Sequence, residues 1–247
     1  ISGGLHGVGA SVTNALSKWM KVWVSRNHEE YYVEFQNGGH TVEPLKKLGH
    51  SDKLQGTIVE FFPDFTVMEQ APFEHDIIAG RLRQLTYLNK GLKIIFIDEQ
   101  TNQKDEWLYE GGLKEYIEDL NRDKEKLVPS IVYGEEEAKV KIPNSLQDET
   151  YNIKVEVAFQ YNKTYNNSCY SFCNNINTIE GGTHEEGFRL ALVKILNRFA
   201  IEKKFIKESD EKFTKDDVVE GLTAIVSIKH PNPQYEGQTK RKLGNTE

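Results

Sequence analysis

Apolar side chains in roughly the first 110 residues follow two spacings, one typical of helices and the other of strands. From Val8 they recur every three or four residues as far as Trp19, which predicts a helix. A second helix is predicted over residues 74–90, with Gly91 as its C-terminal cap. Strands are predicted over residues 21–26, 31–36, 56–62 and 92–99. The pattern therefore indicates an α+β layer with helices packed on a mostly antiparallel sheet.

The remainder of the chain predicts a separate α/β unit, with the boundary near residue 112. A helix is predicted after Gly112, followed by a charged and irregular stretch over residues 121–148. A long helix begins at Thr183, where Thr183 and Glu186 have the spacing of a capping box. Strands are predicted over residues 151–162, 168–178 and 222–230. The apolar run of the last strand predicts a central place in its sheet.

The composition is that of a soluble globular chain. Of the 247 residues, 38% are hydrophobic and 28% are charged, and no apolar run approaches the roughly 18 residues of a membrane span. A chain of this length buries enough surface to fold without a metal or a disulfide. The net charge of −7 disfavours nonspecific nucleic-acid binding, because affinity for the phosphate backbone comes from positive charge.

The sequence contains two cysteines, Cys169 and Cys173, which fall in one predicted strand. Four residues of strand span roughly 13 Å, whereas a disulfide requires Cα atoms within roughly 7 Å. We therefore expect two free thiols, and a metal site is disfavoured because no further His or Cys lies nearby. His184 is interpreted as a structural residue at a helix start, and Asp216 and Asp217 as solvated residues favoured there by the helix dipole.

The string GGLHGVG at residues 3–9 comes directly before the first predicted helix. Glycines let the backbone approach a ligand closely, and a helix N-terminus offers unpaired amides and partial positive charge. This combination suits a di- or triphosphate, with a plain helix-capping glycine turn as the alternative. The spacing differs from the dinucleotide motif G-x-G-x-x-G, and no Gly-Lys-Ser/Thr follows as in a Walker loop.

The longer string ISGGLHGVGASVTNALS resembles the phosphate-binding motif of the GHKL ATPases and, among them, of the type IIA DNA topoisomerases. Further stretches agree with this family in order and spacing: QGTIVEFFP (55–63), NNINTIEGGTHEEGF (174–188) and YEGQTKRKLGN (235–245). The last two resemble the transducer domain of gyrase B subunits and of topoisomerase IV ParE subunits, and gyrase more closely. The resemblance covers essentially the whole chain.

For the fold, the resemblance implies two truncated domains. Residues 1–112 would be the C-terminal part of a GHKL (Bergerat) ATPase domain, a sandwich of helices on a mixed sheet. Residues 113–247 would be a C-terminally truncated transducer domain, an α/β fold of ribosomal-protein type with a left-handed βαβ connection. The chain would then be an internal fragment of a larger protein.

The resemblance also implies roles for single residues. The loop that would wrap the phosphates of ATP consists of Gly4, Leu5, His6, Gly7, Val8 and Gly9. Thr57 would lie at the adenine, where a hydroxyl can join a water-bridged contact, and Arg26 at the mouth of that pocket. Without the resemblance, Thr57 is an ordinary strand residue and Arg26 a solvated charge.

Gln238 and Lys240 match the family's QTK loop, which reaches the γ-phosphate bound by the neighbouring ATPase domain. Lys240 would place a positive charge on a phosphoryl oxygen, and Gln238 would donate a hydrogen bond. Loss of the γ-phosphate would release the loop and couple hydrolysis to domain motion. Without the resemblance, Lys240 belongs to a basic run on a surface turn.

The family's general base, its Mg²⁺-binding asparagine and its adenine-binding aspartate all precede the glycine loop. We therefore expect no metal ligand in this chain and little ATP binding or hydrolysis by it alone, since base catalysis contributes roughly 10²–10⁴-fold. The implied cofactors of the parent enzyme are ATP and Mg²⁺. Its implied partners are DNA, the gyrase A subunit and another copy of the gyrase B subunit, with no membrane. The implied location is the bacterial cytoplasm, with a plastid as the alternative.

Two other hypotheses remain open at this point. The chain could belong to another GHKL protein, such as a chaperone or a mismatch-repair protein, although the QTK loop and the GGTH helix argue against it. It could also be a nucleic-acid-binding module that uses only its α/β half, whose fold resembles a ribosomal protein domain. The net charge of −7 argues against that module.

Overall fold

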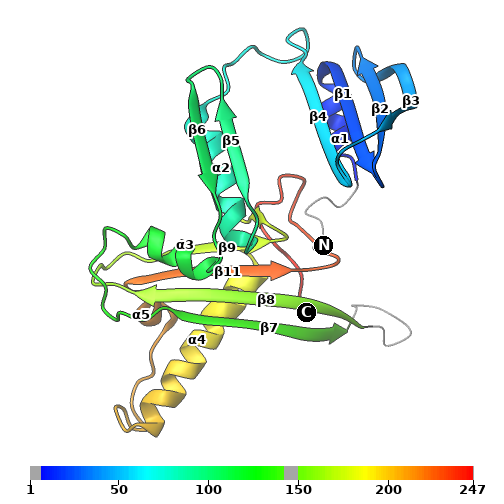
Figure 1. The fold of residues 1–247 in the computed structure, drawn as a ribbon. Helices are drawn as coiled ribbons and strands as arrows, with labels where there is room; N and C mark the ends of the chain where they lie inside the picture. Colours follow the sequence, from blue (N-terminus) through cyan, green and yellow to red (C-terminus); the bar gives the residue numbers. More distant parts are fainter. Residues whose placement is uncertain (1–6, 142–149, 247) are drawn as a thin grey trace. The chain divides into compact units, whose positions relative to one another are not determined.

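The computed structural model describes residues 7–141 and 150–246, which form the α+β fold that the sequence predicts. Internal contacts divide the chain into two compact units, whose described parts lie within residues 7–73 and 74–246. Figure 1 shows the elements of both. Residues 74–112 thus group with the residues that follow them, and the domain boundary expected near residue 112 remains a prediction.

The described part of the first unit is an antiparallel sheet with one short helix. Its elements are α1 (Gly9–Ala15), β1 (Ser17–Arg26), β2 (Glu29–Gln36), β3 (His40–His50) and β4 (Gln55–Pro63). The strands lie in the order β3-β2-β1-β4, so β1 pairs with both β2 and β4. A tight turn at Asn27 and His28, which both have positive φ (55° and 61°), connects β1 to β2.

Helix α1 is shorter than its apolar spacing predicts. It ends at Ala15, and strand β1 already begins at Ser17, whose Oγ donates to the carbonyl of Thr13 (2.6 Å). Trp19, which the spacing places on the helix, lies in the sheet and stacks on Phe62 of β4. The helix prediction is therefore wrong beyond Ala15, because strand pairing on both sides outweighs the local spacing.

Strand β3 is absent from the prediction, for a reason visible in its sequence. It contains Pro44, and its apolar residues Val42, Leu45 and Leu48 lie three apart instead of alternating. The strand lies at the edge of the sheet, where a proline without an N–H group is tolerated. Its pairing with β2 is interrupted by register shifts, as expected for an edge strand.

The second unit contains a mixed sheet, a two-stranded ribbon and helices. In the described residues its elements are α2 (His75–Leu88), β5 (Ile94–Asp98), β6 (Gln103–Trp107), α3 (Leu113–Leu120), β7 (Val132–Lys141), β8 (Thr150–Tyr161), β9 (Ser168–Cys173), β10 (Ile176–Asn177), α4 (Thr183–Glu202), α5 (Lys215–Val219) and β11 (Leu222–Lys229). The sheet order is β10-β9-β11-β8-β7, with β9 and β11 parallel. Strands β5 and β6 form the ribbon.

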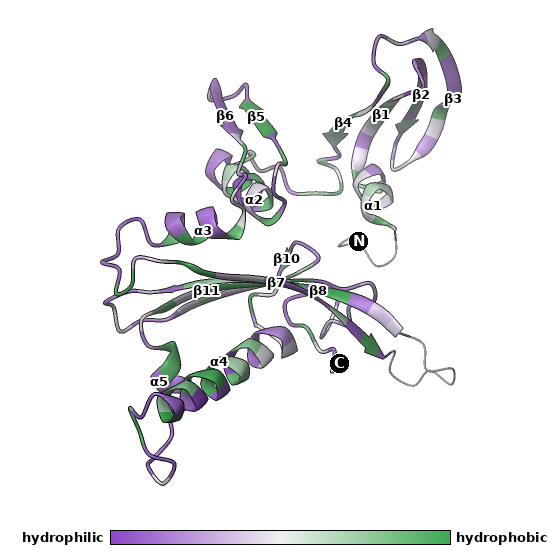
Figure 2. Cartoon of the chain, turned by 60° about the horizontal axis from the view of Figure 1, so that its bottom comes forward, coloured by the Kyte–Doolittle hydropathy of each residue, from purple (hydrophilic) through white to green (hydrophobic). Residues whose placement is uncertain are grey.

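Strand β11 lies at the centre of this sheet, as its apolar run predicts, and residues 222–228 are all buried. Because alternate residues face opposite sides of a sheet, the strand contributes to two cores. Ile225 packs with residues of α2 and α3, whereas Leu222 and Ala224 pack with residues of α4 and α5. Both views show α3 and α4 on opposite sides of the sheet (Figures 1 and 2).

Two strand predictions in this unit are wrong. The stretch predicted as irregular, residues 121–148, contains β7, which pairs with β8 along its whole length. Its run of glutamates, residues 135–137, hides any apolar alternation, and Glu135 forms an ion pair with Lys154 of β8. The single strand predicted over residues 168–178 is a hairpin instead, because the chain turns at Asn174 and Asn175 between β9 and β10.

The capping box predicted at the start of α4 is also wrong. Gly182 is the N-cap of this helix, and no side chain caps it. A capping box does occur at α5, where Thr214 and Asp217 bond reciprocally to each other's backbone, in line with the solvated helix start expected at Asp217. The two cysteines are free, as expected. None of the helices in the described residues combines the length and apolar character of a membrane span.

Candidate functional site

Of the glycine turn, the structure describes the part from Gly7 onward, and Gly4, Leu5 and His6 lie outside the described residues. Gly7 has a left-handed φ of +65°, which favours glycine, although a Cβ there would meet no atom within 4 Å. Val8 is the N-cap of α1, and Gly9 is its first residue. Among the described residues, the requirement for glycine at position 7 is therefore conformational and does not come from packing.

The N-terminus of α1 presents backbone amides that no described side chain caps. The first bond along the helix runs from the amide of Val12 to the carbonyl of Val8 (2.8 Å), so the amides before Val12 point out of the helix end. No side chain of the described residues caps this end, and its first turn contains no acidic residue. These are the properties that an anion at a helix N-terminus requires.

Thr57 and Arg26 lie on the same face of the first sheet. Thr57 pairs directly with Val24, and Arg26 follows Val24 by two residues, so that all three side chains share a face. Arg26 is exposed and lines a surface pocket of about 470 Å³, together with Val24, Glu29 and others. Hydrogen bonds from Lys47 and Tyr31 hold the pKa of Glu29 below its ordinary value, so this carboxylate is already paired.

Gln238 and Lys240 lie in a hairpin-like loop over residues 234–245. Its arms are joined by a bridge between Tyr235 and Leu243 and by the bond from the amide of Glu236 to the carbonyl of Lys242 (2.9 Å). Gln238 is exposed near the tip. Lys240 is half-buried, has a left-handed φ of +56°, and its amide donates to the carbonyl of Gly237 (3.3 Å).

The base of this loop is fixed by the two glycines before α4. The amide of Leu243 donates to the carbonyl of Gly181 (3.2 Å), and the amide of Thr183 donates to the carbonyl of Leu243 (3.1 Å). Gly182 has a φ of +141°, and a Cβ there would lie 2.5 Å from the carbonyl oxygen of Leu243. Only glycine fits this position, and the pairing positions the loop that bears Gln238 and Lys240.

His184 has the structural surroundings expected for it. Its Nε2 lies 3.0 Å from Oγ1 of Thr178, and its Nδ1 is buried without a hydrogen-bond partner among the described residues. Burial lowers the pKa of the imidazole to about 4. Burial likewise raises the pKa of Cys169 to about 12 and that of Cys173 to about 11, so neither thiol is a reactive nucleophile.

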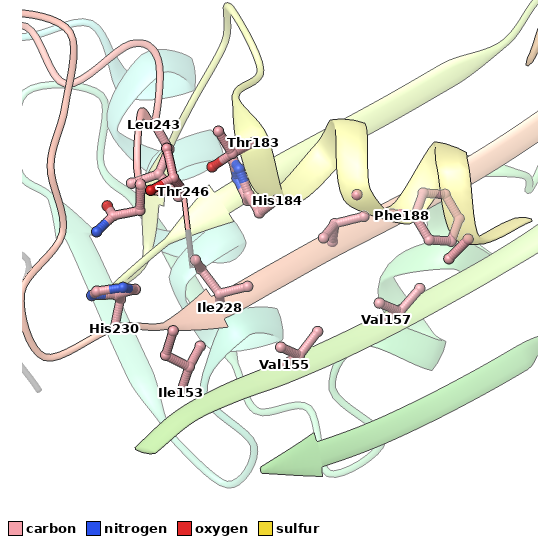
Figure 3. A pocket seen from close by; sticks show the side chains of 14 residues that line it. Ile153, Val155, Val157, Thr183, His184, Phe188, Ile228, His230, Leu243 and Thr246 are labelled. Carbon is pink, nitrogen blue, oxygen red and sulfur yellow. The ribbon is translucent and has the colours of Figure 1, made fainter. Parts of the chain in front are cut away.

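A cavity of about 690 Å³ lies between α4 and the sheet of the second unit (Figure 3), and neither Gln238 nor Lys240 is among its described lining residues. Its walls are largely apolar side chains, such as Val155, Phe188 and Ile228, with His184 and His230 toward one end. Of the described residues that line it, none is lysine or arginine. The cavity therefore lacks the positive charge that a phosphate site requires.

The structure brings together Arg26 with Thr57, and Gln238 with Lys240, each pair within its own unit. The described residues hold no cluster of three or more His, Cys, Asp or Glu side chains placed to bind a metal. Two features were not predicted: Gly182 as the support of the loop, and the Asn174–Asn175 turn. Consecutive asparagines after a strand are a recognisable turn signal, so the second could have been found.

Comparison with known proteins identifies the family. The model of the DNA gyrase B family matches residues 112–247, more than half of the chain. The chain therefore belongs to the DNA gyrase B family, and the resemblance inferred from its motifs is confirmed.

The most similar relatives found include two bacterial proteins that are named as the B subunit of DNA gyrase. That of Mycoplasma pneumoniae is 63% identical over 100% of this chain, and that of Mycoplasma genitalium is 61% identical over the same share. The chain spans 38% of the length of each of these relatives.

Solved structures agree with this assignment. The 43K ATPase domain of Thermus thermophilus gyrase B, in complex with an aminocoumarin, is 34% identical with a TM-score of 0.77 over 97% of this chain and 61% of that one. The topoisomerase IV ATP-binding domain of Francisella tularensis is 27% identical with a TM-score of 0.75, over 99% of this chain and 63% of that one.

Proposed function

We propose that this chain is the ATP-responsive portion of a gyrase B protein, within an ATP-dependent type II topoisomerase that introduces negative supercoils into DNA. Relatives named as gyrase B proteins, which are 61–63% identical over the whole chain, support the proposal. The observation that carries it is the loop over residues 234–245. Its base is fixed at Gly182, and Gln238 and Lys240 lie at its tip.

The glycine turn is proposed to hold the phosphates of ATP. The left-handed Gly7, the outward-pointing amides of α1 and the absence of acidic residues in its first turn fit a bound anion. Gly4, Leu5, His6, Val8 and Gly9 complete this loop in the proposal. Thr57 and Arg26 would contact the nucleotide from the sheet face that they share, with Thr57 at the adenine.

The loop tip is proposed to sense the terminal phosphate. When bound, ATP with Mg²⁺ supplies the charged phosphate whose presence or loss the loop detects. Lys240 would place its ammonium on a phosphoryl oxygen, and Gln238 would donate a hydrogen bond beside it. Because Gly182 holds the base of the loop, a displacement at its tip is transmitted to the N-terminus of α4. The Mg²⁺ ligand and the general base would come from residues outside this chain.

The proposed partners follow from the gyrase B assignment. They are DNA, the gyrase A subunit and a second copy of the gyrase B protein, whose phosphate site the loop would reach. The proposed location is the bacterial cytoplasm, and the relatives reported above are bacterial.

The test replaces Lys240 by Gln in a gyrase B protein that contains this sequence, assayed for ATP hydrolysis and supercoiling with gyrase A. Removing one charge-stabilising contact from a phosphoryl transfer site is expected to lower the hydrolysis rate roughly 100-fold. Lys204→Gln is the matched control, because Lys204 is also a lysine with left-handed φ (62°) and is exposed beyond α4. Hydrolysis by Lys240→Gln within twofold of the control would refute the proposed role.

A further inference from the structure

The turn between β9 and β10 consists of two asparagines, Asn174 and Asn175. Both have left-handed φ (52° and 66°), and Cys173 pairs with Ile176 across the turn. Two consecutive left-handed residues define a tight hairpin turn that matches the twist of its strands. Glycine would adopt these φ values equally well, so the turn conformation alone does not require the two side-chain amides.

The side chain of Asn174 is buried and holds the first residue after β11. Its Oδ1 accepts from the amide of His230 (2.8 Å), and its Nδ2 donates to the carbonyl of His230 (2.8 Å). The amide of Asn174 itself donates to the carbonyl of Ile228 (2.9 Å). Asn174 thereby continues the parallel pairing of β9 with β11 and fixes the start of the segment that leads to the loop at residues 234–245.

The neighbouring Asn175 faces helix α2. Its Nδ2 donates to Oδ1 of Asn89, the C-cap of α2 (3.1 Å), and its carbonyl accepts from Nη2 of Arg81 on the same helix (2.8 Å). Its Oδ1 accepts from Nζ of Lys229, the last residue of β11. Burial lowers the pKa of this half-buried lysine, whose ammonium therefore depends on such a partner.

A further hydrogen bond connects the loop to the residue that precedes this turn. The hydroxyl of Tyr235, at the base of the loop, donates to the carbonyl of Cys173, the residue before the turn (3.2 Å). Gln234 is held in turn, since its amide donates to Oδ1 of Asn245 (2.6 Å). Asn175 thus contacts α2 and the end of β11, Asn174 contacts the entry to the loop at His230, and the preceding Cys173 contacts the base of the loop at Tyr235.

We propose that the Asn174–Asn175 turn is a positioning joint that couples the C-terminal end of α2 to the loop bearing Gln238 and Lys240. The functional meaning of the joint rests on the proposed function, because only then does the loop report a phosphate. Its physical basis is independent of it: directional hydrogen bonds join these two adjacent, conformationally fixed residues to Asn89 at the end of α2 and to Lys229 and His230 at the start of the segment that leads to the loop. If either element shifts, these hydrogen bonds must break, or the residues that they join must move with it.

The test is native-state amide hydrogen exchange on the 247-residue chain without nucleotide. Asn175→Gly keeps the left-handed backbone but removes the bonds to Asn89 and Lys229. Local opening populations should rise roughly two- to tenfold at residues 85–92 and, through the joint, at residues 234–244, which lie beyond the hydrogen-bond partners of Asn175 (Arg81, Asn89 and Lys229). Unchanged exchange at residues 234–244 would overturn the proposal.

The matched control is Asn102→Gly. Asn102 is an exposed, left-handed residue (φ 54°) in the turn between β5 and β6, and no side-chain hydrogen bond of it is found among the described contacts. Asn102→Gly changes the backbone entropy of the unfolded chain as Asn175→Gly does, but it removes no hydrogen bond of the joint. Exchange at residues 234–244 should stay at the wild-type level, and an increase equal to that in Asn175→Gly would show a global effect and refute the joint.

A conservative variant distinguishes positioning of the loop through the joint from a general loss of stability in the unit. Asn175→Asp keeps an acceptor for Lys229 but cannot donate to Asn89. Exchange should therefore rise at residues 85–92 and return toward the wild-type level at residues 234–244. Equal increases at both segments would contradict the joint. If Asn175→Gly does not fold, Asn174→Asp replaces it: this variant loses the donor to the carbonyl of His230 and should raise exchange at residues 234–244.

Failure of the proposed function is distinguishable from failure of the joint. The function is tested separately, by adding a nonhydrolysable ATP analogue to a gyrase B protein that contains this sequence. If the wild-type loop then shows no change in exchange, phosphate sensing fails, while the nucleotide-free results on the joint stand. If the loop is protected by nucleotide but Asn175→Gly exchanges like the wild type without nucleotide, the joint alone is refuted.

Discussion

The two sheets of this chain contain strands of similar length that differ sharply in burial. In β4, every residue from Gln55 to Phe62 is exposed, including large apolar side chains, whereas seven of the eight residues of β11 are buried. Met20 is the one buried apolar side chain among the described residues of 7–73. All three hydrophobic core clusters found in the described residues lie in the second unit.

This difference separates two ways of building a functional element. The first sheet is held mainly by its backbone ladder and presents an open apolar face, on which Thr57 and Arg26 remain accessible. The second unit has packed cores, one of which includes Leu243, and the loop with Gln238 and Lys240 is anchored there by the pairing of Leu243 with Gly181 and Thr183 around Gly182. An open face suits the admission of a ligand, whereas a rigid support suits a side chain that must be positioned accurately.

The largest expected effect tests the packing contrast itself. Phe172→Ala removes a fully buried ring from the second unit, and the free energy of unfolding should fall by about 3–5 kcal/mol. Phe61→Ala removes a ring that is 44% exposed on β4, and a loss of about 1 kcal/mol is expected. Urea titrations followed by circular dichroism measure both. Equal losses would show that the two sheets are packed alike.

A pH titration tests the packing of the second unit through a buried polar side chain, His184. The pKa of His184 is lowered by burial from an ordinary value of 6.5 to about 4, so the unfolded chain takes up this proton at a higher pH than the folded chain. The stability that the neutral His184 contributes is therefore fully present above pH 6.5 and is lost as the pH drops toward 4, by on the order of 3 kcal/mol. In His184→Gln, the free energy of unfolding should depend less on pH between 6.5 and 4 than it does in the wild type. Parallel curves for variant and wild type would contradict the assignment.

Glycine substitutions give the smallest effect. Gly182→Ala forces a Cβ against the backbone of Leu243 at a strained φ, and we expect a loss of about 1–3 kcal/mol in thermal unfolding. Gly187→Ala is the control on the same helix, since its Cβ meets no atom within 4 Å, and a gain of up to about 1 kcal/mol is expected. If both variants melt at the same temperature, the support assigned to Gly182 is wrong.

The fold could be predicted where one pattern dominates locally. The apolar run of β11 and the periodic face of α4 identified a central strand and a long helix. Prediction failed where a distant partner decides the outcome. Trp19 continues a helical spacing, but it lies in β1 and pairs with strands on both sides. Residues 132–141 form β7 because they pair with β8 despite their glutamates. Neither partner is visible within a short window of sequence.

The candidate site shows the same division. The motif around Gln238 and Lys240 predicted a surface turn, which the structure contains. That Gly182 supports this turn depends on a pairing with Leu243, a residue far along the chain, which no local spacing reveals. The assigned roles of Gly4, Leu5, His6, Thr57 and Arg26 remain predictions, because they concern a ligand and not the fold.

The buried thiols have a practical consequence for spectroscopy. With pKa values of about 12 and about 11, Cys169 and Cys173 carry little thiolate at neutral pH and should react slowly with maleimides. A cysteine introduced at the exposed Gln238 would then accept a fluorophore selectively in the otherwise native background. Dye anisotropy or energy transfer could thus follow the loop tip in real time without prior removal of either natural thiol.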